Sequence, residues 1–190
     1  DIILIGGGGH CKSVIDVIEQ EGQFKIAGIV DKPEFLGSDI LGYSVIGNDS
    51  DLGILVKKYK YALVTVGQIK SPILRMKLFE LAKKSGFILP NIISPRAYIS
   101  KYTTVGKGTI IMHDVLINAD AQIGENCIIN SKVLIEHDCS ISNHCHISTS
   151  ATINGGVIVK SGSFIGSGVT TKESIIIGKN SFIKAGSLVT

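Results

Sequence analysis

Tryptophan is absent from this chain, and proline and methionine are rare, with four and two residues. The net charge is only +3, and the scattered lysines form no basic stripe, which argues against nucleic acid as a partner. No apolar run reaches the roughly 18–20 residues that cross a bilayer, so we expect no membrane insertion. The four cysteines lack the spacing of a disulfide framework, which favours a reducing compartment and, by default, a cytoplasmic protein.

Glycine, in contrast, is abundant, with 22 residues among 190, and apolar residues make up 44% of the chain. This composition is typical of a globular protein with many tight turns. The apolar start, DIILIGGGGH, lacks the basic region and cleavage site of a signal peptide, so we interpret it as a buried strand followed by a turn.

The first half of the chain alternates short apolar runs with helical patterns. The apolar runs predict strands over 2–5, 25–31 and 61–67. The helical patterns include a short helix over 50–59 and a strongly capped helix over 71–86. This alternation predicts a small parallel α/β sheet of the Rossmann type, with helices on its faces.

The second half follows a six-residue period. From Ile99 to Val189, every sixth position is isoleucine or valine, except Thr171. Positions two residues earlier are mostly small, and positions one residue later are rich in glycine and asparagine. This repeat indicates a β-solenoid in which the aliphatic and the small residue point inward. We expect the glycines and asparagines, such as Gly106 and Asn118, to supply the positive φ of the corners. The change of pattern predicts two domains, 1–90 and 91–190.

The stretch VLIEHDCSISNHCHIS, residues 133–148, concentrates histidine and cysteine and could be a metal site, a thiol–histidine pair or something else. The six-residue frame turns Cys127, Cys139 and Cys145 inward, where each serves as a small apolar core residue. A zinc site or a nucleophilic cysteine would need these inward thiols to meet outward histidines, so we predict neither a metal nor a thiol nucleophile. We expect His113 and His144 to be ordinary surface residues. His137, at a corner between two acids, is either a solvated surface residue or a functional one.

With its hexads, its GGGGHCK loop and its Glu-His-Asp-Cys motif, the chain resembles the hexapeptide-repeat acyltransferases, and among them the NeuD/PglD group of sugar acetyltransferases. The resemblance covers essentially the whole chain. It implies a left-handed parallel β-helix with three hexads per turn, acetyl-CoA as co-substrate, and a homotrimer with active sites between subunits. It also implies direct transfer without an acyl-enzyme.

The resemblance also implies residue roles. His137 is the general base, and Asp138 orients its ring. The positions that it implies for acetyl-CoA binding are His146, Gly155, Asn130, Ser167 and Ala185, with the Gly155 N–H stabilising the oxyanion. The positions that it implies for binding a nucleotide-linked sugar are Gly8, His10, Cys11, Asp31, Lys32, Gly67 and Gln68.

The glycine-rich loop also has other interpretations. It follows a strand and opens a helix, so its N–H groups are suited to hold a phosphate. A dinucleotide fingerprint would need glycine where Cys11 stands, which argues against NAD although Asp31 has the right spacing for a ribose. A loop that only allows close strand–helix packing remains open. Several relatives carry two consecutive acids where this chain has Asp31 and Lys32.

Three functions follow as hypotheses. The first is N-acetylation of a UDP-linked 4-amino-4,6-dideoxy sugar in surface-glycan biosynthesis. The second is O-acetylation of a sialic or related nonulosonic acid by the same residues. The third is a non-catalytic trimeric scaffold that binds a sugar nucleotide.

Overall fold

The computed structural model describes all 190 residues, which divide into two compact units. The first unit comprises Asp1–Gly67 and Ile73–Pro90, and the second comprises Gln68–Pro72 together with Asn91–Thr190. The chain therefore leaves the first unit after Gly67, contributes five residues to the second unit, and returns. No helix in the chain is long and apolar enough to cross a membrane.

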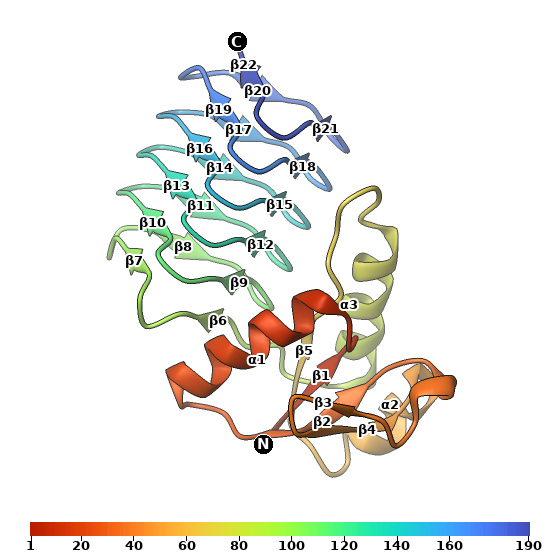
Figure 1. Cartoon of the computed structure of the whole chain (residues 1–190). Helices are drawn as coiled ribbons and strands as arrows, with labels where there is room; N and C mark the ends of the chain where they lie inside the picture. Colours follow the sequence, from red (N-terminus) through yellow and green to blue (C-terminus); the bar gives the residue numbers. More distant parts are fainter. The chain divides into compact units, whose positions relative to one another are not determined.

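A five-stranded sheet forms the centre of the first unit (Figure 1). In spatial order its strands are β3 (Asp39–Ile40), β4 (Tyr43–Gly47), β2 (Ile26–Val30), β1 (Ile2–Ile5) and β5 (Tyr61–Val64). All neighbours are parallel except β3, which pairs antiparallel with β4. The chain starts in the middle of this sheet, builds toward one edge and then crosses to the other, which confirms the predicted Rossmann-like α/β arrangement.

Three α-helices accompany the sheet: α1 (Gly9–Glu21), α2 (Leu52–Leu55) and α3 (Ile73–Ser85). Short 3-10 turns lie at Pro33–Phe35 and Asp49–Asp51. The α1 helix buries its apolar face, and α3 is followed by Gly86 with a φ of +99°, the left-handed conformation that ends a helix. The helix predicted over 50–59 is shorter, because the side chain of Asn48 caps a 3-10 turn before α2 begins.

The second unit is a left-handed parallel β-helix whose two-residue strands form three flat faces (Figure 1). The first face holds β6 (Ile92–Ile93), β9 (Ile110–Ile111), β12 (Ile128–Ile129), β15 (His146–Ile147), β18 (Phe164–Ile165) and β21 (Phe182–Ile183). The second face holds β7 (Tyr98–Ile99), β10 (Leu116–Ile117), β13 (Leu134–Ile135), β16 (Thr152–Ile153), β19 (Thr170–Thr171) and β22 (Leu188–Val189). The third face holds β8 (Thr104–Val105), β11 (Gln122–Ile123), β14 (Ser140–Ile141), β17 (Ile158–Val159) and β20 (Ile176–Ile177).

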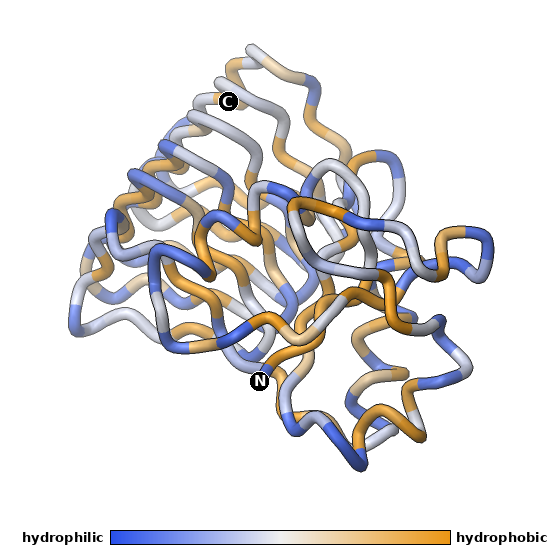
Figure 2. Tube along the Cα trace, turned by 60° about the horizontal axis from the view of Figure 1, so that its bottom comes forward, coloured by the Kyte–Doolittle hydropathy of each residue, from blue (hydrophilic) through white to orange (hydrophobic).

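The predicted inward residues form the core of this β-helix. Isoleucines such as Ile117, Ile135 and Ile153 are fully buried and stack on one another from coil to coil. Each buried isoleucine contributes about 1.5–3 kcal/mol relative to an exposed one. In Figure 2 the apolar segments recur regularly along the coils. Thr171, the one exception to the aliphatic series, is also buried, and its hydroxyl accepts a hydrogen bond from the N–H of Asn154.

The prediction for the corners was wrong in one respect. Positive φ occurs at every sixth residue from Gly108 to Gly186, two positions after the glycines and asparagines that were expected to adopt it. Most of these corner residues are not glycine, and asparagine, aspartate and similar short polar side chains tolerate the left-handed conformation best. Glycine is needed at positions such as 124 for another reason. A Cβ there would lie 2.4 Å from the side-chain oxygen of Asn143 on the next coil.

Candidate active site

His137 stands at a corner of the β-helix, between β13 and β14. The next residue, Asp138, has a φ of +60° and turns the chain. Its carboxylate lies 2.6 Å from Nδ1 of His137, and both side chains are exposed. Because a carboxylate can only accept a hydrogen bond, Nδ1 carries the proton. The neutral ring therefore presents Nε2 as its proton acceptor.

The surroundings of His137 favour its protonated form. The hydrogen bond to Asp138 and the negative charge of Asp138 raise the pKa of His137, and the charge of Glu136 adds a smaller effect in the same direction. Glu136 is itself held in place, since its carboxylate accepts a hydrogen bond of 2.7 Å from the amide of Asn118 on the preceding coil. The contact between Asn118 and Glu136 was not anticipated from the sequence.

Gly155 lies next to His137 on the following coil. A Cβ placed on Gly155 would come within 2.9 Å of both Cε1 and Nε2 of the His137 ring. Only glycine at this position therefore lets the ring stay where it is. The corner is fixed by hydrogen bonds from Gly156 N–H to His137 and from Ser174 N–H to Gly155. The N–H of Gly155 has no hydrogen-bond partner within the chain.

We call the set of corner segments 118–121, 136–139, 154–157 and 172–175, which follow the second face, the histidine corner. The segments 112–115, 130–133, 148–151, 166–169 and 184–187, which precede that face, form the asparagine corner. His137, Asp138 and Gly155 lie at the histidine corner. Asn130, Ser167 and Ala185 lie at the asparagine corner. The structure therefore divides the predicted site residues between the two edges of the second face and does not bring them together in one chain.

The asparagine corner is closely packed. The side-chain oxygen of Asn130 accepts the N–H of Ser131 at 2.9 Å, and the hydroxyls of Ser148 and Ser167 lie 2.9 Å apart. A Cβ on Gly166 would lie 2.4 Å from the nitrogen of Ala185, so glycine is needed for the coils to meet there. The Ser148–Ser167 pair was missed in the sequence because its residues are 19 positions apart.

His146 lies on the outer side of the first face, as predicted, but is buried, with 6% of its surface exposed. Its Nδ1 hydrogen-bonds the main-chain oxygen of Gln68, and its ring packs edge-on against Phe164, with centroids 5.2 Å apart. Gln68, predicted to bind the nucleotide-linked sugar, thus contacts a residue predicted to bind acetyl-CoA.

The inward cysteines are in the predicted core position. Cys127, Cys139 and Cys145 are buried, and their thiols donate to main-chain oxygens. Burial raises the pKa of Cys139, and a hydrogen bond with Cys127 together with burial raises that of Cys145. No group of three or more histidine, cysteine or acidic side chains is arranged to hold a metal ion.

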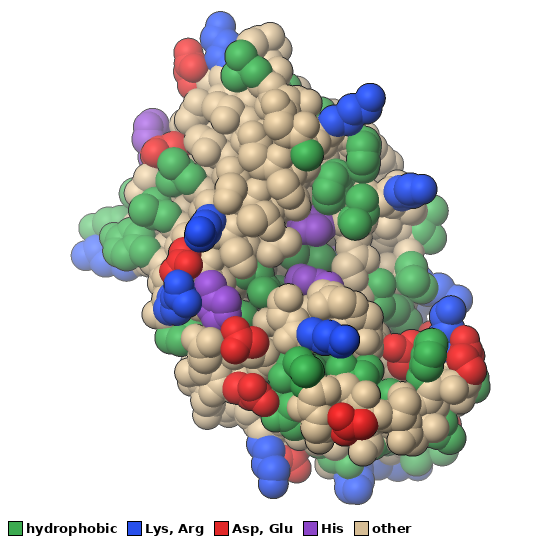
Figure 3. All heavy atoms as spheres, in the orientation of Figure 1, with side chains coloured by type: hydrophobic (Ala, Val, Ile, Leu, Met, Phe, Trp, Pro, Cys, Tyr) green, Lys and Arg blue, Asp and Glu red, His purple; other side chains and the backbone are tan.

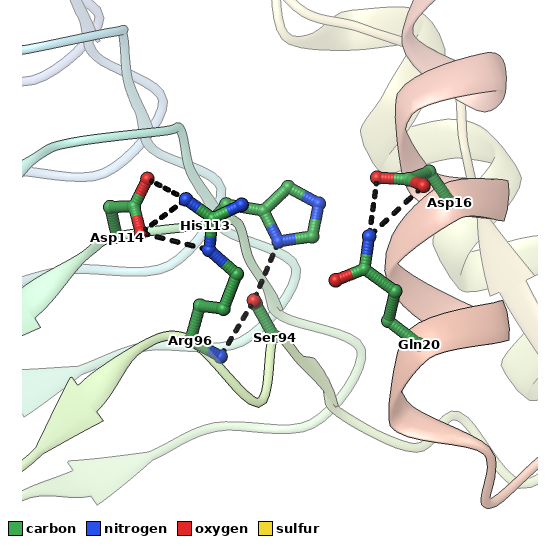
Figure 4. Close-up of polar contacts among 6 residues, drawn as sticks. All are labelled: Asp16, Gln20, Ser94, Arg96, His113 and Asp114. Carbon is green, nitrogen blue, oxygen red and sulfur yellow. Dashed lines mark hydrogen bonds and ion pairs between the residues drawn. The ribbon is translucent and has the colours of Figure 1, made fainter.

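The remaining histidines and nearby charges have local structural contacts. His113 pairs through Nδ1 with the Ser94 hydroxyl at 2.7 Å, and the guanidinium of Arg96 forks onto Asp114 (Figure 4). Figure 4 also shows the amide of Gln20 reaching Asp16 one turn earlier in α1. On the face of the β-helix seen in Figure 3, charged side chains are sparse.

In the first unit, the glycine loop lies between β1 and α1, as predicted. The carboxylate of Asp31 accepts the N–H of Gly7 at 2.6 Å and that of Lys32 at 2.8 Å. A Cβ on Gly7 would lie 2.8 Å from the same carboxylate, which explains the glycine. Asp31 thereby fixes the loop, a role that the sequence did not reveal.

Two cavities adjoin this loop. One, of about 370 Å³, is lined by Gly6, Asp31, Lys32 and residues 48–50, among others. The other, of about 380 Å³, is lined by Gly7, Gly8, Lys12, Asp31 and the segment around Ile40.

The other predicted residues of the loop differ in accessibility. Gly8 is exposed, whereas the side chain of Cys11 is fully buried and its pKa is raised to about 11 by burial. Because the thiol is buried, Cys11 can contact a ligand only through its main chain. His10 lies beside Gly67, since a Cβ on Gly67 would lie 3.6 Å from that of His10.

A left-handed β-helix built from six-residue repeats is the fold of the hexapeptide-repeat class of acyltransferases. Two family profiles match the chain: the PglD N-terminal domain over residues 1–80, and the bacterial transferase hexapeptide (six repeats) over residues 102–137. Among curated protein sequences there is no match.

Several solved structures are similar over the full chain. PerB from Caulobacter crescentus, in complex with CoA and GDP-perosamine, is 35% identical, has a TM-score of 0.93, and is aligned over 100% of this chain and 88% of its own. The acetyltransferase domain of PglB from Neisseria gonorrhoeae FA1090, in complex with acetyl coenzyme A, is 28% identical, with a TM-score of 0.92 and coverage of 100% and 90%. WeeI from Acinetobacter baumannii AYE, 22% identical with a TM-score of 0.88 and coverage of 100% and 91%, shares the fold. The chain belongs to the NeuD/PglD family of acetyl-CoA-dependent sugar acetyltransferases.

Proposed function

We propose that this protein transfers the acetyl group of acetyl-CoA to the 4-amino group of a nucleotide-linked 4-amino-4,6-dideoxy sugar, for use in surface-glycan biosynthesis. The observation that carries the proposal is the His137 ring, held by Asp138 through Nδ1 and lying against Gly155. Relatives 34–35% identical were solved with CoA and GDP-perosamine, which supports an amino-sugar acceptor over the hydroxyl of a nonulosonic acid.

His137 acts as the general base. The sugar amine attacks the thioester carbonyl carbon, the new C–N bond forms, and Nε2 of His137 takes the proton that the nitrogen loses. The tetrahedral intermediate then collapses, the C–S bond breaks, and the thiolate of CoA leaves and takes up that proton. Asp138 keeps Nδ1–H in place and stabilises the imidazolium that forms. Transfer is direct, because the inward thiols of the β-helix are buried.

The N–H of Gly155 stabilises the oxyanion of this intermediate. It makes no hydrogen bond within the chain and lies beside the His137 ring, so a carbonyl oxygen could reach it while the attacking amine faces Nε2. Removing one donor of this kind from an enzyme typically costs about 10²–10³ in kcat. Because the donor is a main-chain N–H, a substitution at position 155 cannot remove it and can only change where it lies.

The complete site forms between two copies of the chain in a homotrimer. The histidine corner and the asparagine corner lie on either side of the second face. If this face points toward a threefold axis in each copy, the histidine corner of one copy meets the asparagine corner of the next. The outer side of the second face is more apolar than that of the third face, with Tyr98, Leu116 and Leu188 exposed. The pantetheine arm then runs along Asn130, Ser167 and Ala185.

The first unit holds the nucleotide of the acceptor. The N–H groups of the glycine loop, with Gly8 and His10, face the phosphates. Asp31 and Lys32 border the cavities of this loop, and Gly67 lies beside His10. UDP is our first candidate for the nucleotide and GDP the second, because of the GDP-perosamine complexes of the relatives. The four free thiols agree with the cytoplasm as the compartment, which we also propose.

The test is the release of free CoA thiol from acetyl-CoA with UDP-linked and GDP-linked 4-amino-4,6-dideoxy sugars and with free sialic acid as acceptors. We expect release with one nucleotide-linked amino sugar, and a loss of about 10²–10⁴-fold in His137→Ala. His144→Asn is the matched control, since asparagine tolerates the φ of +61° at that position, and it should keep full activity. Release with sialic acid alone, or equal activity of His137→Ala, contradicts the proposal.

A further inference from the structure

The side chain of Glu136 is held in a fixed position beside the proposed base. One oxygen of its carboxylate, Oε2, accepts a hydrogen bond of 2.7 Å from the side-chain amide of Asn118 on the preceding coil. The other oxygen, Oε1, makes no hydrogen bond within the chain. Glu136 is half-buried and directly precedes His137 at the histidine corner. The anchored carboxylate therefore keeps one acceptor oxygen available next to the base.

Small residues leave the space around His137 open. Residues 18 positions apart lie one above the other in this β-helix, as the register of the strands shows. By this spacing, the neighbours of His137 on the preceding and following coils are Ala119 and Gly155. The side chain of His137 is 65% exposed. A reacting group can therefore approach the ring from solvent, without a large side chain of either neighbouring coil in its way.

The charges at this part of the corner are negative. The segments 118–121 and 136–139 contain three acids, Asp120, Glu136 and Asp138, and no lysine or arginine. The charge of Glu136 contributes to the raised pKa of His137, so the two side chains are close enough to interact. These carboxylates attract a cation or a hydrogen-bond donor and repel an anion. An amino group, which is protonated in water at neutral pH, suits this environment better than the carboxylate of a sialic acid.

An amine and a hydroxyl differ in the number of hydrogens that they can donate. A neutral amine that attacks with its lone pair still has two N–H groups, whereas a hydroxyl has one O–H. The corner offers two acceptors, Nε2 of His137 and Oε1 of Glu136. An attacking nitrogen can donate to both. An attacking oxygen leaves one acceptor without a donor and turns a lone pair toward a negative carboxylate, which costs free energy.

We propose that Glu136 is a specificity-determining residue: its Oε1 accepts a hydrogen bond from the attacking amine while the other N–H of that amine points to Nε2 of His137, so the site selects an amine over a hydroxyl. This inference rests on the proposed function. Asn118 fixes the direction of the carboxylate. No bond forms or breaks at Glu136, since the proton leaves through His137 and the carboxylate stays ionised throughout the transfer.

The kinetic test uses Glu136→Gln in the whole chain. Its amide oxygen can still accept the hydrogen bond from Asn118, but the charge is lost and the NH₂ group faces the acceptor. With a UDP- or GDP-linked 4-amino-4,6-dideoxy sugar, we expect kcat/KM to fall about 10- to 100-fold, the effect of one hydrogen bond to a charged group, with the KM for acetyl-CoA unchanged. The rates are compared on the pH plateau, where His137 is neutral in both proteins. Glu173→Gln is the matched control, because it removes an exposed acid from the same corner and should keep the wild-type rate.

A binding measurement tests the selectivity itself. Without acetyl-CoA, calorimetric titration compares the 4-amino sugar nucleotide with its counterpart that carries a hydroxyl at C4. We expect the wild type to bind the amine about tenfold more tightly, and Glu136→Gln to bind the two about equally. A variant that keeps the preference, or that weakens both ligands equally, overturns the inference. If the wild type neither binds nor acetylates the amino sugar, the proposed function fails as well, so the two failures are distinguishable.

Discussion

The imidazole of His137 lies against the Cα of Gly155, so close that the first carbon of any side chain at position 155 would come within 2.9 Å of Nε2. Glycine at 155 therefore keeps space for the base. The same absence of a side chain leaves the N–H of Gly155 open to a ligand. One residue thus serves both halves of the proposed reaction, the removal of a proton and the stabilisation of an oxyanion.

We predict that Gly155→Ala displaces the His137 ring and lowers kcat about 10²-fold, the cost of misplacing a catalytic group by roughly 1 Å. The backbone at Gly155 does not require glycine for its φ, so the fold should persist, as a thermal melt would show. Gly178→Ala is the matched control, because its Cβ would meet nothing closer than the Ser181 hydroxyl at 3.5 Å. Equal kinetics for the two variants would show that His137 does not depend on this space.

The pH dependence follows from Asp138. This carboxylate raises the pKa of His137 above its ordinary value of about 6.5, and the base acts only when neutral. Hence kcat/KM should fall as the pH drops through that raised pKa. Asp138→Asn removes the charge while tolerating the φ of +60°, so the acidic limb should move to lower pH while the maximal rate also declines. If the acidic limb of the pH profile stays in place in Asp138→Asn, the titration of a group other than His137 controls it.

The repeat made the β-helix predictable because every inward position obeys the same packing rule. The positive-φ positions were misplaced because sequence composition cannot distinguish two causes of glycine, a left-handed φ and a close approach of coils. Gly124 and Gly166 are examples of the second cause. Strands β3 and β4 were missed because neither contains a long apolar run: Tyr43–Gly47 has only Val45 and Gly47 buried.

The roles of the site residues depend on contacts across long sequence separations. The pairing of His137 with Asp138 could be predicted from the sequence, because the two residues are neighbours in the chain. The contact of His146 with Gln68 joins residues 78 positions apart, and nothing in the sequence marks Gln68–Pro72 as part of the second unit. The support of Glu136 by Asn118 likewise appears only once the coils are stacked.

Cys139 offers a test of direct transfer. Its thiol is buried, it donates to the main-chain oxygen of Asn154 at 3.1 Å, and burial raises its pKa, so it is a poor nucleophile. We predict that Cys139→Ala keeps kcat within about twofold of the wild type and loses about 1 kcal/mol of stability in a denaturant titration. A loss of activity comparable to that of His137→Ala, in a folded protein, would instead indicate a covalent acyl-enzyme.

The division of site residues between two corners leads to a prediction about mixed trimers. His137→Ala removes the base from the histidine corner, and Ala185→Tyr fills the asparagine corner with a bulky side chain. Each variant alone should be inactive. When the two are unfolded together and refolded as a mixture, a site is complete wherever an intact histidine corner meets an intact asparagine corner, which random assembly gives in about a quarter of sites. The measurement is thiol release by the mixture, beside each variant refolded alone and a sedimentation profile. Recovered activity requires that neighbouring copies share the site. A trimer with no recovery would place the whole reaction within one chain, and a monomer would remove the shared site altogether.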